Sequence, residues 1–441
     1  MTTPEGLSPV AADLQDERLR TSEGLGGFVR SLGERIRGGD LGVLPVIVGL
    51  VVIWTVFQSL NSSFLSSANL GNLLMESAAV GVISLGIVCV LLVGEIDLSV
   101  GSVSGLSAAI LGVSFVQHDW PVWLAVLASL AAGATIGFVY SVVYTRFGVP
   151  SFVISLAGLL GFLGLQLKVL GPSGTINLPF DSPIVKLGQL WFVPATLSYV
   201  LVVLAAAGFF LARFGRSRAR AAAGLSSVPV SHLALQAGAM AVVLLAAAWY
   251  MNQARGIGWM FVLFVGLVLA MHYALTRTRW GRSVFAVGGN EEAARRAGVN
   301  VNRVYMTVFM LASTLAALGG VLAAGRLAAA AQSSGTGDVN LNAIAAAVIG
   351  GTSLFGGRGS AFAALLGILV ISSISSGLTL VNLDSSWRFM VTGGVLLRRD
   401  PGLGRTAIAG QSRQGLAAPQ HLAHGRVSVP RTARGRCRCA V

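Results

Sequence analysis

Two carboxylates follow a long apolar run in the stretch GEIDLSVGS, residues 94–102. Glu95 and Asp97 come directly after the apolar residues 91–93, so a membrane-spanning run would place their charges at a costly depth. Acidic side chains in such places commonly bind ions or substrates, or carry protons. The alternative is structural, with Asp97 or Ser99 capping a helix that begins near residue 99 at the membrane interface. The residues alone leave both interpretations open.

The pattern G-x-x-x-L-x-x-G occurs twice, at residues 94–101 and 350–357, with Leu98 in the first copy and Leu354 in the second. Each copy follows one apolar run and precedes another. Paired, glycine-interrupted helices form substrate sites in many transporters, although glycine is also common in ordinary membrane helices. The residues expected to form a translocation path or a helix break are Glu95, Asp97, Ser99, Gly101, Gly350 and Gly351.

A second distinctive stretch is NEEAARRAG, residues 290–298. Asn290 is a favourable N-cap, the glutamates at 291–292 suit the positive end of the helix dipole, and Gly298 can end the helix in a left-handed turn. The predicted helix of about two turns is too short to be stable alone. We expect it to dock on a partner, and the alternative is a solvated loop helix. The residues concerned are Asn290, Glu291, Glu292, Ala293, Ala294, Arg295 and Gly298.

The residue pattern does not support chemistry of other kinds. A phosphate-binding loop needs Gly-Lys followed by Ser or Thr, whereas the two lysines, Lys168 and Lys186, follow Leu and Val. His421 and His424 have no further ligands at metal-binding spacing. We therefore expect a protein that is not an enzyme, with no metal site and no cofactor of its own.

The elements that would position these residues are membrane helices. Of the 441 residues, 54% are hydrophobic and 11% are charged, with a mean hydropathy of +0.76, whereas soluble domains carry about 25% charged residues. Runs of about 20 apolar residues can cross a bilayer as helices. The sequence predicts an all-α, polytopic transmembrane bundle of ten to twelve spans, near residues 41–60, 72–93, 99–116, 121–144, 150–170, 189–212, 234–250, 257–275, 304–325, 341–355, 360–381 and 386–397.

The net charge of +14 is interpreted as a topology signal rather than as a nucleic-acid-binding surface. The arginines at 30–37, 213–220 and 277–303 all face the cytoplasm if the first span begins there, as the positive-inside rule requires. Both termini are then expected on the cytoplasmic side. The predicted parts are a cytoplasmic tail at 1–40, a transmembrane domain at 41–397 with a cytoplasmic loop at 277–303, and an arginine-rich tail at 398–441.

Four stretches together resemble one family. They are GEIDLSVGSVSGL (94–106), VPSFVISLAGLLGF (149–162), GRSVFAVGGNEEAARRAGVNV (281–301) and AIAAAVIGGTSLFGGRGS (343–360). In this order, spread over roughly residues 41–393, they closely resemble the membrane permease of bacterial sugar ABC importers of the ribose, xylose and galactose class. The chain is most similar to the xylose-type permease.

The resemblance implies a transport subunit in the bacterial cytoplasmic membrane. Two permease chains would form the path, a cytoplasmic ATPase would bind ATP, and an extracytoplasmic binding protein would deliver a monosaccharide, with xylose or another pentose expected. Residues 290–298 would then be the coupling helix seated on the ATPase. Membrane lipid is expected as a partner and nucleic acid is not. The rival hypothesis is an ion-coupled secondary transporter that uses Glu95 and Asp97.

The C-terminal end departs from the family pattern. The apolar run at 386–397 is too short to cross a bilayer, and an arginine-rich tail follows it from Arg398. We interpret this end as a shifted reading frame or an altered end that leaves the last span incomplete. The alternative is a genuine cytoplasmic extension that contacts anionic lipid.

Overall fold

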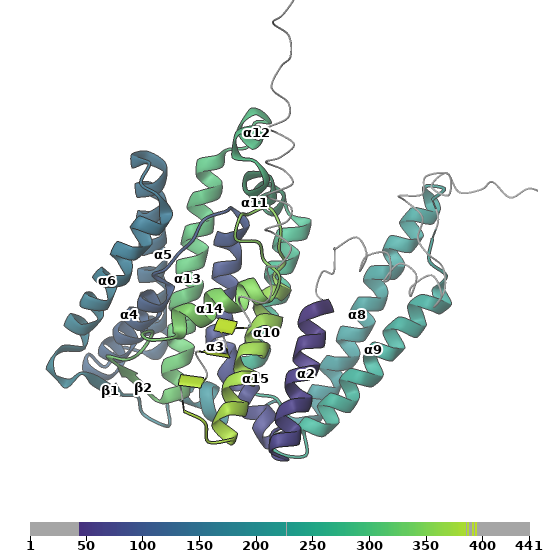
Figure 1. Cartoon of the computed structure of the whole chain (residues 1–441), viewed down its shortest axis with the longest axis horizontal. Coiled ribbons are helices and arrows are strands. Elements are labelled where there is room, and N and C mark those ends of the chain that lie inside the picture. The colour runs from purple at the N-terminus through teal and green to yellow at the C-terminus, as the bar shows by residue number, and fades with distance from the viewer. Residues whose placement is uncertain (1–43, 226, 385, 388–389, 392, 395–441) are drawn as a thin grey trace, which may run out of the picture. The chain divides into compact units, whose positions relative to one another are not determined.

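Helices make up most of the computed structural model, which describes residues 44–225, 227–384, 386–387, 390–391 and 393–394 (Figure 1). Two short strands, β1 (Thr175–Asn177) and β2 (Ala329–Ala331), pair antiparallel with Ile176 opposite Ala330. The all-α fold predicted from the composition is confirmed. The helices in chain order are α2 (Leu44–Leu60), α3 (Ser67–Leu92), α4 (Val100–Gly112) with a π-helical turn (Val113–Gln117), α5 (Val122–Phe147), α6 (Ser151–Leu170) with a 3-10 turn (Gly171–Ser173), α7 (Pro183–Val185) with a π-helical turn (Lys186–Leu190), α8 (Ala195–Ala222), α9 (Val230–Met251), α10 (Trp259–Arg277), α11 (Arg279–Gly289), α12 (Glu291–Arg296), α13 (Val301–Leu327), α14 (Val339–Ile349) and α15 (Phe362–Leu380).

Most of these helices are long enough to cross a membrane. Within the described residues, nine helices have both the length and the apolar composition of a membrane span. The 17-residue α2 is shorter, but it still reaches the lower end of the length that spans a bilayer. Counting α2 gives ten, the lower end of the predicted ten to twelve, and the predicted polytopic bundle is confirmed.

The predicted span at 341–355 is wrong. Here α14 covers only Val339–Ile349, 11 residues, or about 16 Å at 1.5 Å per residue, which is half the thickness of a bilayer core. The chain then leaves the helix, and Gly351 has a φ of +115°. Apolar composition alone could not reveal this break, because alanine and glycine also fill continuous membrane helices.

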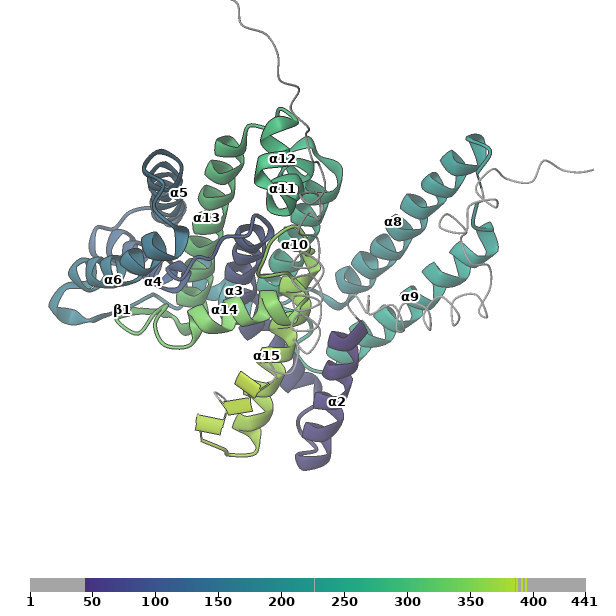
Figure 2. The ribbon, with the colours of Figure 1, turned by 45° about the horizontal axis from the view of Figure 1, so that its top comes forward.

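The boundaries predicted at 189–212 are also wrong. The structure starts α8 at Ala195 and continues it to Ala222, so the arginines at 213–220 lie on a helix rather than in a loop. Arginine is a good helix former, and its long side chain can reach the membrane surface from a helix end. In Figures 1 and 2, α8 and α9 lie side by side as a hairpin. Half of the run 386–397 lies outside the described residues, and the predicted tails 1–40 and 398–441 lie wholly outside them.

The buried centre of the bundle consists of α3, α4 and α13. In the most apolar part of α3, 83% of the residues are buried, compared with 11% in α8. α13 packs against α3, α4 and α5, and these contacts are close because small residues line them. Gly133 of α5 leaves room for the backbone of α13, since a Cβ there would lie 2.6 Å from the carbonyl oxygen of Ser313. Close backbone contact of this kind is how membrane helices associate.

Replacing Gly137 by valine should disrupt the contact between α5 and α13. A Cβ at Gly137 would overlap the carbonyl of Phe309, and overpacking of this kind typically lowers the free energy of unfolding by about 1–3 kcal/mol. The matched control is Gly161→Val on α6, where no atom lies within 4 Å of the added Cβ. Thermal unfolding in detergent micelles would measure both. Equal melting temperatures for the two variants would contradict the packing described here.

Candidate coupling surface and translocation path

The short helix predicted at 290–298 is present as α12. Its N-cap is Asn290, whose Oδ1 accepts a hydrogen bond of 2.8 Å from the backbone N–H of Ala293. Arg295 pairs with Glu291 at 2.7 Å and Arg296 pairs with Glu292 at 3.1 Å, each one helical turn away. Exposed ion pairs of this spacing add little stability, so the cap and the packing of α12 must hold it in place. Its role in docking stays a prediction.

One side of α12 packs against the protein and the other is open to solvent. Ala294 is 4% exposed, and Glu291 is half-buried. Glu292, Ala293 and Arg296 are exposed; we call these three residues the exposed face of α12. The preceding helix α11 is tied to α13 by a hydrogen bond in which Trp280 donates to Thr307 at 2.8 Å. The exposed face of α12 therefore follows directly after a helix, α11, that is itself bonded to α13.

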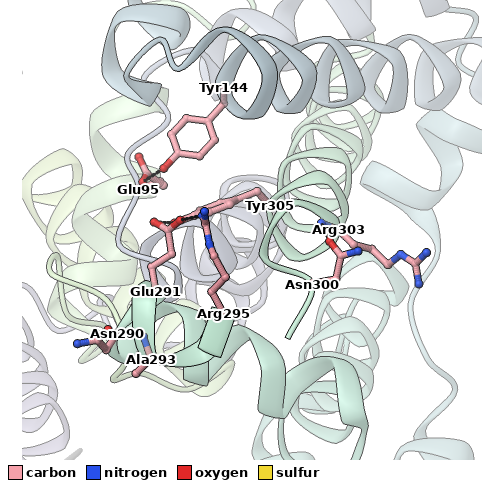
Figure 3. A network of polar contacts seen from close by, with 9 residues as sticks. All are labelled: Glu95, Tyr144, Asn290, Glu291, Ala293, Arg295, Asn300, Arg303 and Tyr305. Carbon is pink, nitrogen blue, oxygen red and sulfur yellow. Dashed lines mark hydrogen bonds and ion pairs between the residues drawn. The ribbon is translucent and has the colours of Figure 1, made fainter. Parts of the chain in front are cut away.

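A chain of polar contacts connects α12 to the loop between α3 and α4 (Figure 3). The hydroxyl of Tyr144, in the last turn of α5, donates to Oε1 of Glu95 at 2.6 Å. The ring of Tyr144 lies 4.7 Å from the ring of Tyr305, centroid to centroid. The hydroxyl of Tyr305, near the start of α13, donates to Oε2 of Glu291 at 3.4 Å. Side chains from four elements thus meet at one place: the loop at 93–99, α5, and the consecutive helices α12 and α13. We call this place the tyrosine link (Glu95, Tyr144, Tyr305 and Glu291).

The tyrosine link borders an open cleft of about 370 Å³. The fold brings Glu95 together with Glu291 and Arg295 of the predicted docking helix, which the sequence singled out as a separate motif. Sequence reasoning missed the two tyrosines, although the chain has only six tyrosines and two of them meet here. The cleft is lined by Glu95, Tyr144, Thr145, Gly148, Pro150, Glu291, Arg295, Asn302 and Tyr305.

Asp97 has quite different surroundings from Glu95. It is 1% exposed, and its Oδ1 accepts hydrogen bonds from the backbone N–H of Ser99 at 2.8 Å and from the Ser99 hydroxyl at 2.7 Å. The hydroxyl of Tyr140 donates in turn to Ser99 Oγ at 2.8 Å. Burial raises the pKa of the Asp97 carboxyl, and the bonds from Ser99 partly offset that rise. Asp97 therefore holds the chain where α4 begins, with Ser99 as the N-cap position, whereas Glu95 lines the cleft.

The two copies of the glycine pattern come into contact, although their backbones differ. The N–H of Gly357 donates to the carbonyl of Leu92 at 2.9 Å, and a Cβ on Gly356 would lie 2.9 Å from the backbone nitrogen of Gly94. Gly288, at the end of α11, packs so closely that a Cβ there would overlap the Leu92 carbonyl. We call this place the glycine junction (Gly94, Gly288, Gly356 and Gly357). The first copy leads into α4, whereas the second has no regular helix.

An irregular segment at 332–338 runs beside α4, where glycines leave room for it. A Cβ on Gly101 would lie 2.5 Å from the carbonyl oxygen of Gly335, and Nδ2 of Asn340 donates to the Leu98 carbonyl at 2.6 Å. Backbone groups inside a membrane protein must find partners within the protein. Gln166 of α6 meets this need, since it is fully buried and its Nε2 donates to the carbonyls of Ala331, Gln332 and Ser334 at 3.0, 3.3 and 3.0 Å.

Gly350, another residue expected on the path, packs against the carbonyl of Ala363 at the start of α15. It ends α14 as its C-cap, and Gly351 continues with its left-handed φ. Gly350 and Gly351 thus let the chain leave α14, whereas Gly101 leaves room for the segment at 332–338. Their contact with a substrate stays a prediction.

Known proteins with similar sequences are membrane permeases. A family model described as branched-chain amino acid transport system / permease component matches residues 69–398. The xylose transport system permease protein of Escherichia coli (strain K12) is 33% identical over 361 residues, which cover 81% of this chain and 90% of that protein. The ribose import permease protein of the same strain is 31% identical over 80% of this chain and 90% of its own length. The fructose import permease protein of Rhizobium meliloti is 28% identical, with coverages of 80% and 82%. No solved structure matches the chain.

Proposed function

The chain belongs to the permease family whose model matches residues 69–398, and we propose that it is the membrane subunit of an ATP-driven importer. The proposed cargo is a monosaccharide, with xylose or another pentose as the substrate. The family resemblance inferred from the four sequence stretches is confirmed. The identity and coverage shared with xylose and ribose permeases support a pentose over other cargo. The observation that carries the proposal is α12, a capped helix that exposes one face while the other is tied into the bundle.

The proposed partners are those that the family resemblance implies. A cytoplasmic ATPase would seat the exposed face of α12 and bind the ATP, so that this chain itself needs no cofactor. A second copy of the chain would complete the path, and a binding protein on the other side of the membrane would deliver the sugar. In this arrangement both termini lie in the cytoplasm, on the side of α12. Closure of the ATPase would push α12, and the helices would alternate between outward-facing and inward-facing states.

The experiment is an uptake assay in bacterial cells that lack their own pentose and ribose transporters. The chain is expressed with its cognate ATPase and binding protein, and labelled xylose, ribose and fructose are supplied in turn. We expect pentose uptake to require all three components. Equal uptake by the chain alone would contradict the proposal.

The ion-coupled alternative also has an observation in its favour. Asp97 is a buried carboxyl whose Oδ2 has no hydrogen-bond partner within the described residues. Buried carboxylates in membrane proteins can carry protons. The two functions differ in their energy source, and a measurement of that source separates them.

A further inference from the structure

We propose that Tyr144 and Tyr305 are positioning residues that transmit the displacement of α12 to the loop preceding α4. This inference rests on the proposed function, because it requires an ATPase to move α12. The inferred route runs from Glu291 through Tyr305 and Tyr144 to Glu95. This route connects α12, whose other face is exposed to solvent, to the loop that leads into the buried helix α4.

The strong end of this route is at Glu95. A hydroxyl-to-carboxylate distance of 2.6 Å is typical of a charge-assisted bond, which is about twice as strong as a neutral one. Within the described residues, Glu95 forms no ion pair with a basic side chain. The Tyr144 hydroxyl is therefore the side-chain donor that fixes this carboxylate, and with it the loop at 93–99.

The weak end of the route is at α12. The 3.4 Å bond from Tyr305 to Glu291 is longer than an ordinary hydrogen bond between oxygens. Tyr305 is only 3% exposed, and its tilted ring contact with Tyr144 is a favourable aromatic geometry. The two rings thus move as a unit with α5 and α13, while Glu291 moves with α12. Pressing α12 towards α13 shortens this contact, and withdrawing α12 breaks it.

The glycine junction provides a second connection to the same loop. Gly288 lies three residues before the first residue of α12 and packs against the Leu92 carbonyl, which also accepts the hydrogen bond from Gly357. A displacement of α11 and α12 therefore reaches residue 92 through backbone contact and residue 95 through the tyrosine link. Both connections end just before Asp97 and Ser99, which set the start of α4. α4 in turn borders the irregular segment at 332–338.

The test measures sugar transported per ATP hydrolysed in proteoliposomes that contain the chain, its cognate ATPase and its binding protein. The variants are Tyr144→Phe, Tyr305→Phe and the double variant, which keep both rings and remove only the hydroxyls. The matched control is Tyr250→Phe, because the Tyr250 hydroxyl donates to the carbonyl of Leu65 at 2.9 Å, away from α12. Labelled xylose is the probe.

We expect each single variant to bind the ATPase normally and to transport about three to ten times less sugar per ATP, since each loses a bond to a charged group. The double variant should be no worse than the more impaired single variant, because the two contacts act in series. Tyr250→Phe should match the unmodified protein. Glu95→Gln keeps a hydrogen-bond acceptor but removes the charge. It should lower the sugar transported per ATP as the tyrosine variants do, while the packing of the Tyr144 and Tyr305 rings stays unchanged.

Two results would overturn the inference. One is a normal ratio in both single variants, and the other is a double variant whose loss equals the product of the single losses. If the unmodified protein shows no ATP-dependent uptake, then the proposed function fails instead. If it transports normally and the tyrosine variants do too, only the tyrosine link fails.

Discussion

ATP-dependent sugar uptake should fall at least about a hundredfold when Ala293 is replaced by tryptophan, a loss that corresponds to about 2.7 kcal/mol of interaction free energy. Ala293 lies on the exposed face of α12 and contributes its backbone N–H, not its side chain, to the cap at Asn290. A tryptophan there leaves the helix intact but adds an indole ring where a partner's groove must close over the methyl group. Bulky side chains at the centre of an interface typically have the largest effects on binding.

Co-purification with the cognate ATPase and labelled-pentose uptake would measure the effect of Ala293→Trp. The control is Ala223→Trp, at an exposed position just beyond the C-terminal end of α8. We expect the control to bind the ATPase and transport sugar normally, and both variants to insert in the membrane equally well. Normal ATPase binding by Ala293→Trp would show that α12 is a solvated loop helix rather than a docking element.

The second large effect is expected at Gln166. Leucine has a similar volume but removes the donor that serves three backbone carbonyls at 331–334. An unsatisfied buried polar group costs about 1–3 kcal/mol, and water cannot replace the lost donor in a fully buried site. We therefore expect Gln166→Leu to lower the free energy of unfolding by at least about 2 kcal/mol and to loosen the segment at 332–338.

The stability of Gln166→Leu is compared with that of Gln236→Leu by thermal unfolding in detergent. Gln236 is exposed on α9 and accepts one hydrogen bond from Arg213 at 2.7 Å, so its replacement should cost little. Hydrogen exchange at 332–338 would show whether the loss is local to that segment. Similar melting temperatures and unchanged exchange would mean that Gln166 does not support the segment at 332–338.

The features that sequence predicted best are those with local causes. The helix α12 is specified by Asn290, the following glutamates and Gly298, all within nine residues, so its cap could be predicted without knowledge of the fold. Long apolar runs such as α3 depend only on the length needed to cross a bilayer. The caps and the short length of α12 also indicated that it docks on a partner, but the identity of that partner, an ATPase, came from family resemblance.

The features that sequence did not predict depend on contacts between distant segments. Tyr144 and Glu95 are 49 residues apart, and nothing near either residue indicates the other. The break after Ile349 depends on tight packing of Gly350 against α15, and residues 341–355 look like a continuous apolar span in composition. The repeated glycine pattern correctly drew attention to two segments, but the structure shows that they touch each other rather than share one conformation.

The energy source of transport tests the central claim most directly. Proteoliposomes containing the chain, its cognate ATPase and its binding protein are given labelled xylose, with ATP and a proton gradient each supplied or withheld. The permease assignment predicts sugar accumulation that requires ATP on the side of α12 and is unchanged when a protonophore collapses the gradient. Accumulation that continues without ATP but stops with the protonophore would contradict it and would assign Glu95 and Asp97 to an ion-coupled carrier.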